Sequence, residues 1–232
     1  AMVTDASFEL VWDDTGIRLR DLSGTIGGGE VSVELAICCA GPLTEKQVSG
    51  RLALTGVQID AIVPPLVAAS LDGILDGGAR FQGTGDSLQA VLGAMTGEGS
   101  YRISGLRAEA LNPRTFAEVA SLDTILEMAP AALSQLIVDK LDDAPFLADE
   151  ISGGFTIAGG VVRSANVAME GEGVRLFGGT SLRLADLALD GGYTMSPTTP
   201  TTPSALIDQS GAQVAVKIGG TLPTPERKFD VA

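Results

Sequence analysis

The stretch that decides the fold is Glu30-Val31-Ser32-Val33-Glu34-Leu35-Ala36-Ile37, in which apolar residues alternate with polar or small ones. Successive side chains of an extended chain point to opposite faces, so the four apolar residues share one face. This alternation is typical of an antiparallel strand with one packed face and one solvated face. The sequence therefore predicts a half-buried strand here.

The same period of two continues outward from this strand. Residues 8–12, 17–20 and 51–54 alternate in the same way, and glycines at 27–29 supply a turn between two of these runs. We therefore expect residues 7–55 to form a meander of consecutive hairpins.

Residues 56–150 carry helical patterns between further strands. A short helix is expected over 66–75, and a second one after Asp86, which is a good N-cap. The longest helical pattern covers 112–142, with Asn112 as its cap, and Pro130 should kink it or split it into a helical hairpin. One long apolar stripe on this segment must lie against other apolar surface.

The remaining chain returns to β structure. Hairpins are expected over 151–195, with a bulge near Ala185-Asp186, where the alternation changes phase. A Thr/Pro-rich linker is expected over 196–204, because prolines recur every third residue. A terminal strand and tail complete the chain over 205–232. We interpret residues 1–232 as a single domain fragment.

These patterns together predict a mainly β (α+β) fold. We expect a strongly curved antiparallel sheet that forms a trough or half-barrel, with about three short helical segments capping its concave side or packing on it. Hydrophobic residues make up 45% of the chain and aromatic residues only 4%. The packed face of the sheet must therefore be largely aliphatic.

Charge and composition argue against several classes of function. The formal net charge of −14 opposes binding to nucleic acid or to anionic lipid surfaces. The sequence has no histidine, which removes the commonest general base and the commonest zinc ligand. We expect no cofactor and no metal site, and we expect carboxylate pairs such as Asp142-Asp143 to lie at solvated turns rather than to act as catalytic pairs. The adjacent Cys38 and Cys39 are expected to be small apolar side chains without a disulfide between them.

Several segments, in this order, resemble the C-terminal region of the AsmA-like family. They are residues 52–57 (LALTGV), 83–92 (GTGDSLQAVL), 95–103 (MTGEGSYRI), 155–161 (FTIAGGV) and 218–227 (IGGTLPTPER). The last segment is similar to the ending of the alphaproteobacterial branch. The resemblance covers roughly residues 8–232 and is carried by glycines and apolar residues in a shared order.

The resemblance implies a role in outer-membrane biogenesis. It implies a periplasmic module of a membrane-associated cell-envelope protein, anchored to the inner membrane by a segment upstream of Ala1. It also implies kinship with bridge-like lipid transfer proteins, so the expected partners are phospholipid acyl chains or envelope proteins, with no nucleic acid. The family offers no catalytic residues, and we expect no enzyme activity. The alternative is a protein-interaction module that assists or regulates outer-membrane protein assembly.

The residues themselves allow such a lipid groove. An acyl chain that leaves a bilayer forfeits about 0.8 kcal/mol per CH₂ group, which only a continuous apolar surface can replace. The alternating strands offer thirteen aliphatic or aromatic candidates for its lining: Val31, Val33, Leu35, Leu52, Leu54, Phe155, Ile157, Val167, Leu176, Leu182, Leu184, Val214 and Val216. The same residues could instead face the helices and form an ordinary core, and the sequence leaves both interpretations open.

Overall fold

The protein is a single open sheet with a few short helices, seen here in a computed structural model that describes residues 2–14, 16–38, 46–198 and 212–231. Twelve strands follow one another in chain order, and each pairs antiparallel with the next. Strands account for 63% of the chain and helices for 16%, and the sheet does not close on itself. The predicted mainly β fold and the meander of hairpins are confirmed.

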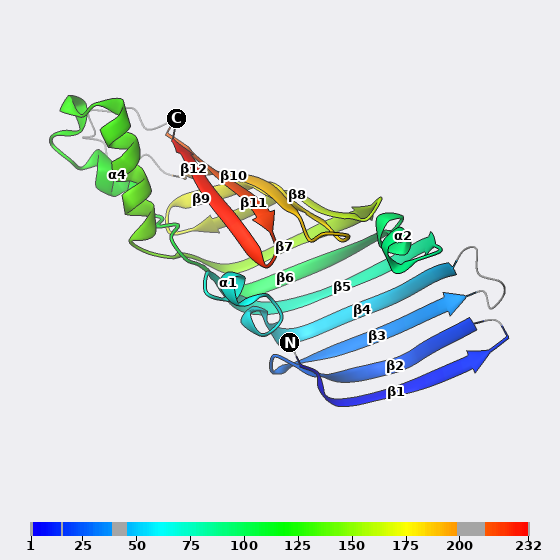
Figure 1. The fold of residues 1–232 in the computed structure, drawn as a ribbon. Coiled ribbons are helices and arrows are strands. Elements are labelled where there is room, and N and C mark those ends of the chain that lie inside the picture. The colour runs from blue at the N-terminus through cyan, green and yellow to red at the C-terminus, as the bar shows by residue number, and fades with distance from the viewer. Residues whose placement is uncertain (1, 15, 39–45, 199–211, 232) are drawn as a thin grey trace.

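The sheet is broad, because it has twelve strands and each strand is 8 to 15 residues long (Figure 1). In chain order they are β1 (Thr4–Asp13), β2 (Gly16–Ile26), β3 (Gly29–Cys38), β4 (Lys46–Gln58), β5 (Leu71–Gly85), β6 (Thr96–Ala108), β7 (Phe146–Ala158), β8 (Val161–Gly171), β9 (Val174–Arg183), β10 (Leu189–Pro197), β11 (Val214–Thr221) and β12 (Thr224–Val231).

The helices occupy the connections between strands. They are the 3-10 turn η1 (Ile59–Ala61), α1 (Pro65–Ala68), α2 (Leu88–Gly93), α3 (Thr115–Ala120), the 3-10 turn η2 (Ile125–Glu127) and α4 (Pro130–Asp142). Figure 1 shows α2 at one end of the strands, α1 at the other, and α4 projecting beyond the sheet.

Strand register assigns each side chain to one of two faces, because residues directly opposite each other share a face. Val33 of β3 lies opposite Leu52 of β4, which lies opposite Ala79 of β5. The same row continues to Gly99 and Phe155. We call this apolar side the inner face, and the opposite side the outer face.

The C-terminal half of the sheet curls over its own inner face and is packed there. Figure 1 shows β12 crossing in front of β6 and β7. The Arg227 guanidinium of β12 donates a hydrogen bond to the backbone oxygen of Glu109, 2.7 Å away, just after the end of β6. The buried core lies inside this curl and joins strands to α3 and α4; it contains Leu106, Leu111, Phe116, Leu141, Phe146, Ala148, Ile151, Val167, Val174, Leu176, Met195, Val214 and Val216.

Helix α2 packs on the inner face at the end of β5. A Cβ added to Gly83 would lie 2.7 Å from the Val91 backbone oxygen, so the helix lies directly on this strand. Ser87 caps the helix by accepting a hydrogen bond from the Ala90 amide at 3.2 Å. The N-cap is therefore Ser87 and not the predicted Asp86.

The helix predicted over 66–75 is too long. Only Pro65–Ala68 is helical, and Leu71–Gly85 forms β5, because pairing with both β4 and β6 outweighs the local helical pattern. The long helical segment is interrupted before Pro130, as predicted, but its first helix starts after Arg114 rather than at Asn112.

The chain after β9 differs from the predictions in two places, and a third prediction lies mostly outside the described residues. The chain reverses between β9 and β10, so residues 185–186 belong to a turn rather than to a bulge. The tail after β11 is a strand, β12, joined to β11 by a turn at Leu222-Pro223. Most of the predicted Thr/Pro linker lies outside the described residues.

The cysteine prediction is not supported. The structure records Cys38 as disulfide-bonded, whereas Cys39 lies outside the described residues.

Candidate functional site

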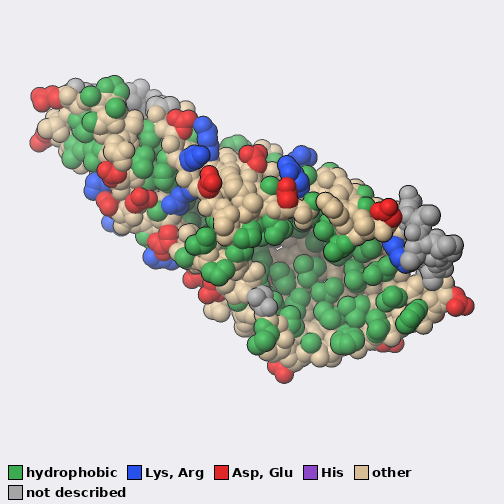
Figure 2. Space-filling model, in the orientation of Figure 1, with side chains coloured by type: hydrophobic (Ala, Val, Ile, Leu, Met, Phe, Trp, Pro, Cys, Tyr) green, Lys and Arg blue, Asp and Glu red, His purple; other side chains and the backbone are tan. Residues whose placement is uncertain are grey.

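The inner face of the N-terminal half is an open trough with an apolar wall. Figure 2 shows a hollow in which hydrophobic side chains gather while the charged ones lie around it. The wall begins on β3 and β4, where Val33, Leu35, Leu52 and Leu54 are half-buried and lie outside the core cluster. Part of each of these four side chains therefore remains available for contact.

Exposure of the wall increases toward β1. Leu10 lies opposite Leu19 and Trp12 opposite Ile17, so all four belong to the inner face. Phe8, Leu10 and Trp12 are 61%, 57% and 79% exposed, respectively. Three large apolar side chains exposed on one strand make a continuous apolar patch rather than a scatter of single residues.

Aromatic rings and glycines face each other on this wall. A Cβ added to Gly50 would lie 2.7 Å from Cζ of Phe81, because the ring lies over the glycine from the neighbouring strand. In the same way Phe155 covers Gly99, again from the strand alongside. Each ring fills the space that a second side chain would need, and this keeps the wall smooth and closely packed.

The structure separates the thirteen predicted lining residues into three groups. Six of them lie together on the inner face of β3, β4 and β7, and Ile157 is buried at the end of β7 beside them; these seven are Val31, Val33, Leu35, Leu52, Leu54, Phe155 and Ile157. Leu182 and Leu184 are half-buried at the end of β9 and in the turn after it. Four belong to the packed core of the C-terminal half and offer no groove surface: Val167, Leu176, Val214 and Val216.

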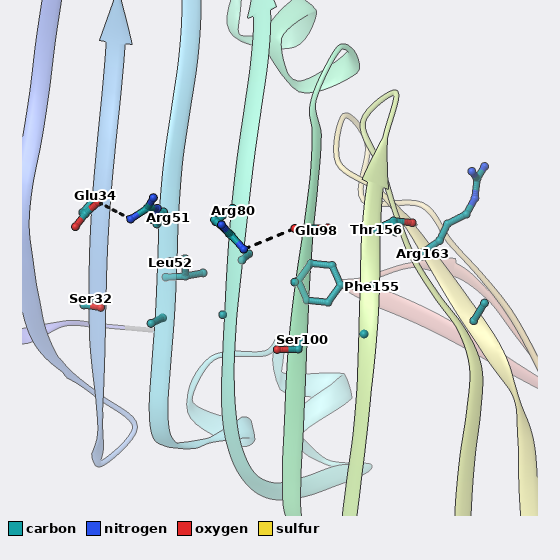
Figure 3. Close-up of a pocket in the computed structure, with 16 residues that line it drawn as sticks. Ser32, Glu34, Arg51, Leu52, Arg80, Glu98, Ser100, Phe155, Thr156 and Arg163 are labelled. Carbon is teal, nitrogen blue, oxygen red and sulfur yellow. Dashed lines mark ion pairs between the residues drawn. The ribbon is translucent and has the colours of Figure 1, made fainter.

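The outer face carries a row of charged side chains. The row contains Glu34, Arg51, Arg80 and Glu98, which lie directly opposite one another on successive strands, and it ends at the uncharged Thr156. The charged residues of this row form two ion pairs. Arg51 Nη1 lies 3.9 Å from Glu34 Oε2, and Arg80 Nη2 lies 3.7 Å from Glu98 Oε1 (Figure 3).

An open hollow on the outer face is lined in part by this row. Its floor is made of small outer-face residues, and Figure 3 shows the charged side chains around it. The floor residues are Ser32, Ala53, Gly78, Ser100, Gly154 and Ala165. Because the ion pairs are long and the side chains are more than half exposed, we assign this row to solubility and to keeping the outer face in water.

Sequence reasoning missed a group of four hydroxyls on the inner face. Tyr101 Oη lies 3.0 Å from Ser164 Oγ, and Thr180 Oγ1 lies 2.9 Å from Tyr193 Oη. The two pairs adjoin, because Ser164 lies directly opposite Thr180. A signal was present in the sequence, since Ser164 and Thr180 occupy inward positions of otherwise apolar strands, but Ser164, the partner of Tyr101, lies 63 residues further along the chain.

Two absences concern the described residues alone. Among them, no three or more Cys, Asp or Glu side chains gather in a way that would hold a metal ion. In the same part of the chain, no helix combines the length and the hydropathy needed to cross a bilayer.

Comparison with protein-family models, with curated proteins and with solved structures finds no match to this chain.

Proposed function

We propose that this chain binds the acyl chains of phospholipids in its trough. The observation that carries the proposal is the wall itself, which is apolar and open along β3, β4 and the strands beside them (Figure 2). A continuous wall replaces the contacts that an acyl chain loses on leaving a bilayer, at about 0.8 kcal/mol per CH₂ group. Its aliphatic side chains match the flexible shape of such chains.

The setting of this activity is part of the same proposal. The resemblance to the AsmA-like family supports a periplasmic module that holds or conducts phospholipid between inner and outer membrane, in a protein anchored to the inner membrane. The net charge of −14 is consistent with lipid contact through apolar surface rather than through anionic headgroups. We propose no catalytic role.

A pair of neighbouring substitutions tests lipid binding. Leu52 faces the trough, whereas Ala53, the next residue of β4, is exposed on the outer face. Leu52→Glu places a charge where acyl chains would lie, and it should reduce lipid binding at least tenfold, because burying an unpaired carboxylate against hydrocarbon is costly. Ala53→Glu adds the same charge to the outer face and should leave lipid binding unchanged.

Binding would be measured by displacement of N-phenylnaphthylamine with short-chain phospholipid, and folding by circular dichroism. Equal binding by both folded variants and the wild type would show that the trough does not take lipid.

The second candidate is a module that pairs with strands of envelope proteins. The observation in its favour is β1, whose other edge has no partner strand among the described residues and whose residues are nearly all exposed. Such an edge can accept a strand from another chain. Crosslinking from Glu9 that captures an outer-membrane assembly protein, with no lipid bound to the purified chain, would favour this function over the first.

A further inference from the structure

The four hydroxyls of Tyr101, Ser164, Thr180 and Tyr193 mark the place where the open trough meets the packed core. Both tyrosines pack against the core cluster, and all four side chains remain half-buried rather than enclosed. Tyr101 belongs to β6 and reaches across Gly153 of β7 to Ser164, so the group spans β6 to β10. We call it the hydroxyl cluster.

Counting protons shows what the hydroxyl cluster can still bind. Ser164 donates its proton to the backbone oxygen of Gly154 at 3.1 Å, so Tyr101 must be the donor in the bond between Tyr101 and Ser164. That pair has no proton left to donate. Thr180 and Tyr193 share one bond but own two protons, which leaves one donor without a partner among the residues that the structure describes.

The cross-strand rows that contain the four hydroxyl side chains hold one charged residue among the described strands, Arg227 of β12. It lies three strands from Thr180, and its guanidinium already donates a hydrogen bond to the backbone oxygen of Glu109. By strand register, Lys46, the first residue of β4, is the sole charged side chain on the inner face of β3 to β9 within the described ranges. Burial raises the pKa of Tyr193, as does the nearby Tyr101, so its phenol stays protonated at neutral pH. A neutral acceptor therefore suits the free donor better than a phosphate or a carboxylate, which would need a cation beside it.

We propose that the hydroxyl cluster is a polar subsite for the ester group of an acyl lipid bound in the trough. The free proton of the Thr180–Tyr193 pair donates to an ester carbonyl while the acyl chains lie along the aliphatic wall toward β3. This inference rests on the proposed lipid binding and adds where the ester region lies and which chemistry it meets. The ligand class it names is the ester-linked glycerolipid.

The test compares two ligands that differ only in the ester carbonyls. They are 1,2-didodecanoylglycerol and its ether analogue 1,2-didodecylglycerol, each measured by displacement of N-phenylnaphthylamine. The wild type should prefer the ester ligand. The double variant Thr180→Val/Tyr193→Phe should raise the Kd of the ester ligand roughly three- to tenfold, as expected for one lost hydrogen bond, and leave the Kd of the ether ligand within about twofold.

The proton count supplies sharper controls. Each single variant, Thr180→Val or Tyr193→Phe, keeps one free proton and should retain most of the preference for the ester. The double variant Tyr101→Phe/Ser164→Ala removes a pair without a spare proton and should retain the preference as well.

The outcomes separate this inference from the proposed function. A wild type that binds both ligands equally well, or a Thr180→Val/Tyr193→Phe variant that loses both to the same extent, would overturn the subsite and leave the trough standing. An equal loss of ester preference in the Tyr101→Phe/Ser164→Ala variant would overturn it too. Binding of neither ligand by the wild type would overturn the proposed function, and the subsite with it.

Discussion

In the trough wall, the ring of Phe81 lies directly over Gly50 of the neighbouring strand. A Cβ on Gly50 would also lie 2.8 Å from the backbone oxygen of Glu34. Movement of the Phe81 ring alone therefore cannot relieve the steric clash of an alanine at this position. Gly50→Ala should lower the free energy of unfolding by about 1–3 kcal/mol, the usual range for overpacking. Urea titration would measure the change.

Gly192 offers the matched control, because a Cβ added there meets nothing within 4 Å. Gly192→Ala should leave stability unchanged or raise it by about 0.4–1 kcal/mol through the unfolded chain. Equal destabilisation by both substitutions would show that the close approach of ring and glycine is not the cause.

Tyr193 gives the inner face a measurable pH dependence. Its pKa lies above the ordinary 10.0, chiefly because burial disfavours the phenolate. The unfolded chain then loses this proton first as pH rises, so the stability that depends on the neutral phenol is present below about pH 10 and is lost as pH rises through the folded-state pKa.

Absorbance at 295 nm follows this ionisation in a chain with only two tyrosines. Tyr193→Phe should remove the component that titrates above the ordinary range. If both tyrosines of the wild type ionise with midpoints at or below pH 10, the raised pKa of Tyr193 is contradicted.

At the scale of single elements, Arg227 links β12 to the chain segment that follows β6, in addition to the pairing of β12 with β11. The Arg227 guanidinium donates to Glu109 and lies 5.1 Å from the centre of the Phe229 ring. Arg227→Met keeps the length of the side chain and removes the donor. It should cost about 0.5–1.5 kcal/mol, with the hydrogen bond discounted for partial exposure, and speed amide exchange in β11 and β12.

Lys228, the next residue, supplies the control. Its ion pair with Glu226 spans 3.8 Å between strongly exposed groups, and Lys228→Met should change neither stability nor exchange appreciably. Faster exchange in both variants would point to a general effect of lost charge rather than to the bond to Glu109.

The strands also show what alternation can and cannot predict. Val33 and Val216 sit in runs of the same period, and both face inward as expected. Only Val216 is buried, because the curl of the sheet encloses it in the core cluster, whereas Val33 lies outside that cluster and is half-buried. A period of two fixes the face of a side chain but not what lies above that face. Core and groove therefore could not be told apart from the sequence.

Long-range pairing accounts for the other differences. Residues 71–75 look helical on their own, yet they join β5 because β4 and β6 lie on both sides of them. The hydroxyl cluster escaped prediction for the same reason, since Tyr101 and Ser164 meet across β7. Short turns and glycine pairs, in contrast, depend on local sequence, and the order of hairpins was predicted from them.

At the scale of the whole molecule, the two halves of the sheet should differ in stability. The buried core gathers from β6 onward, whereas β1 and β2 have almost no buried side chain and β1 has one partner strand. Amide exchange should therefore proceed by local opening in β1 and β2, while amides of β9 to β11 exchange only with global unfolding. Uniform protection along the chain would contradict this division.

Bound lipid should stabilise mainly the N-terminal half of the sheet, which has the smaller buried core. Under the proposed function an acyl lipid covers the inner face of β3 and β4 and adds apolar contacts that the C-terminal half already has from its own core. Binding stabilises the folded state in proportion to ligand concentration over Kd, so saturating 1,2-didodecanoylglycerol should slow exchange in β1 to β4 by roughly tenfold or more. The amides of β9 to β11 should slow only as far as global stability rises. Slowing confined to β9 to β11 would place the ligand in the curled half and would contradict binding along the open wall.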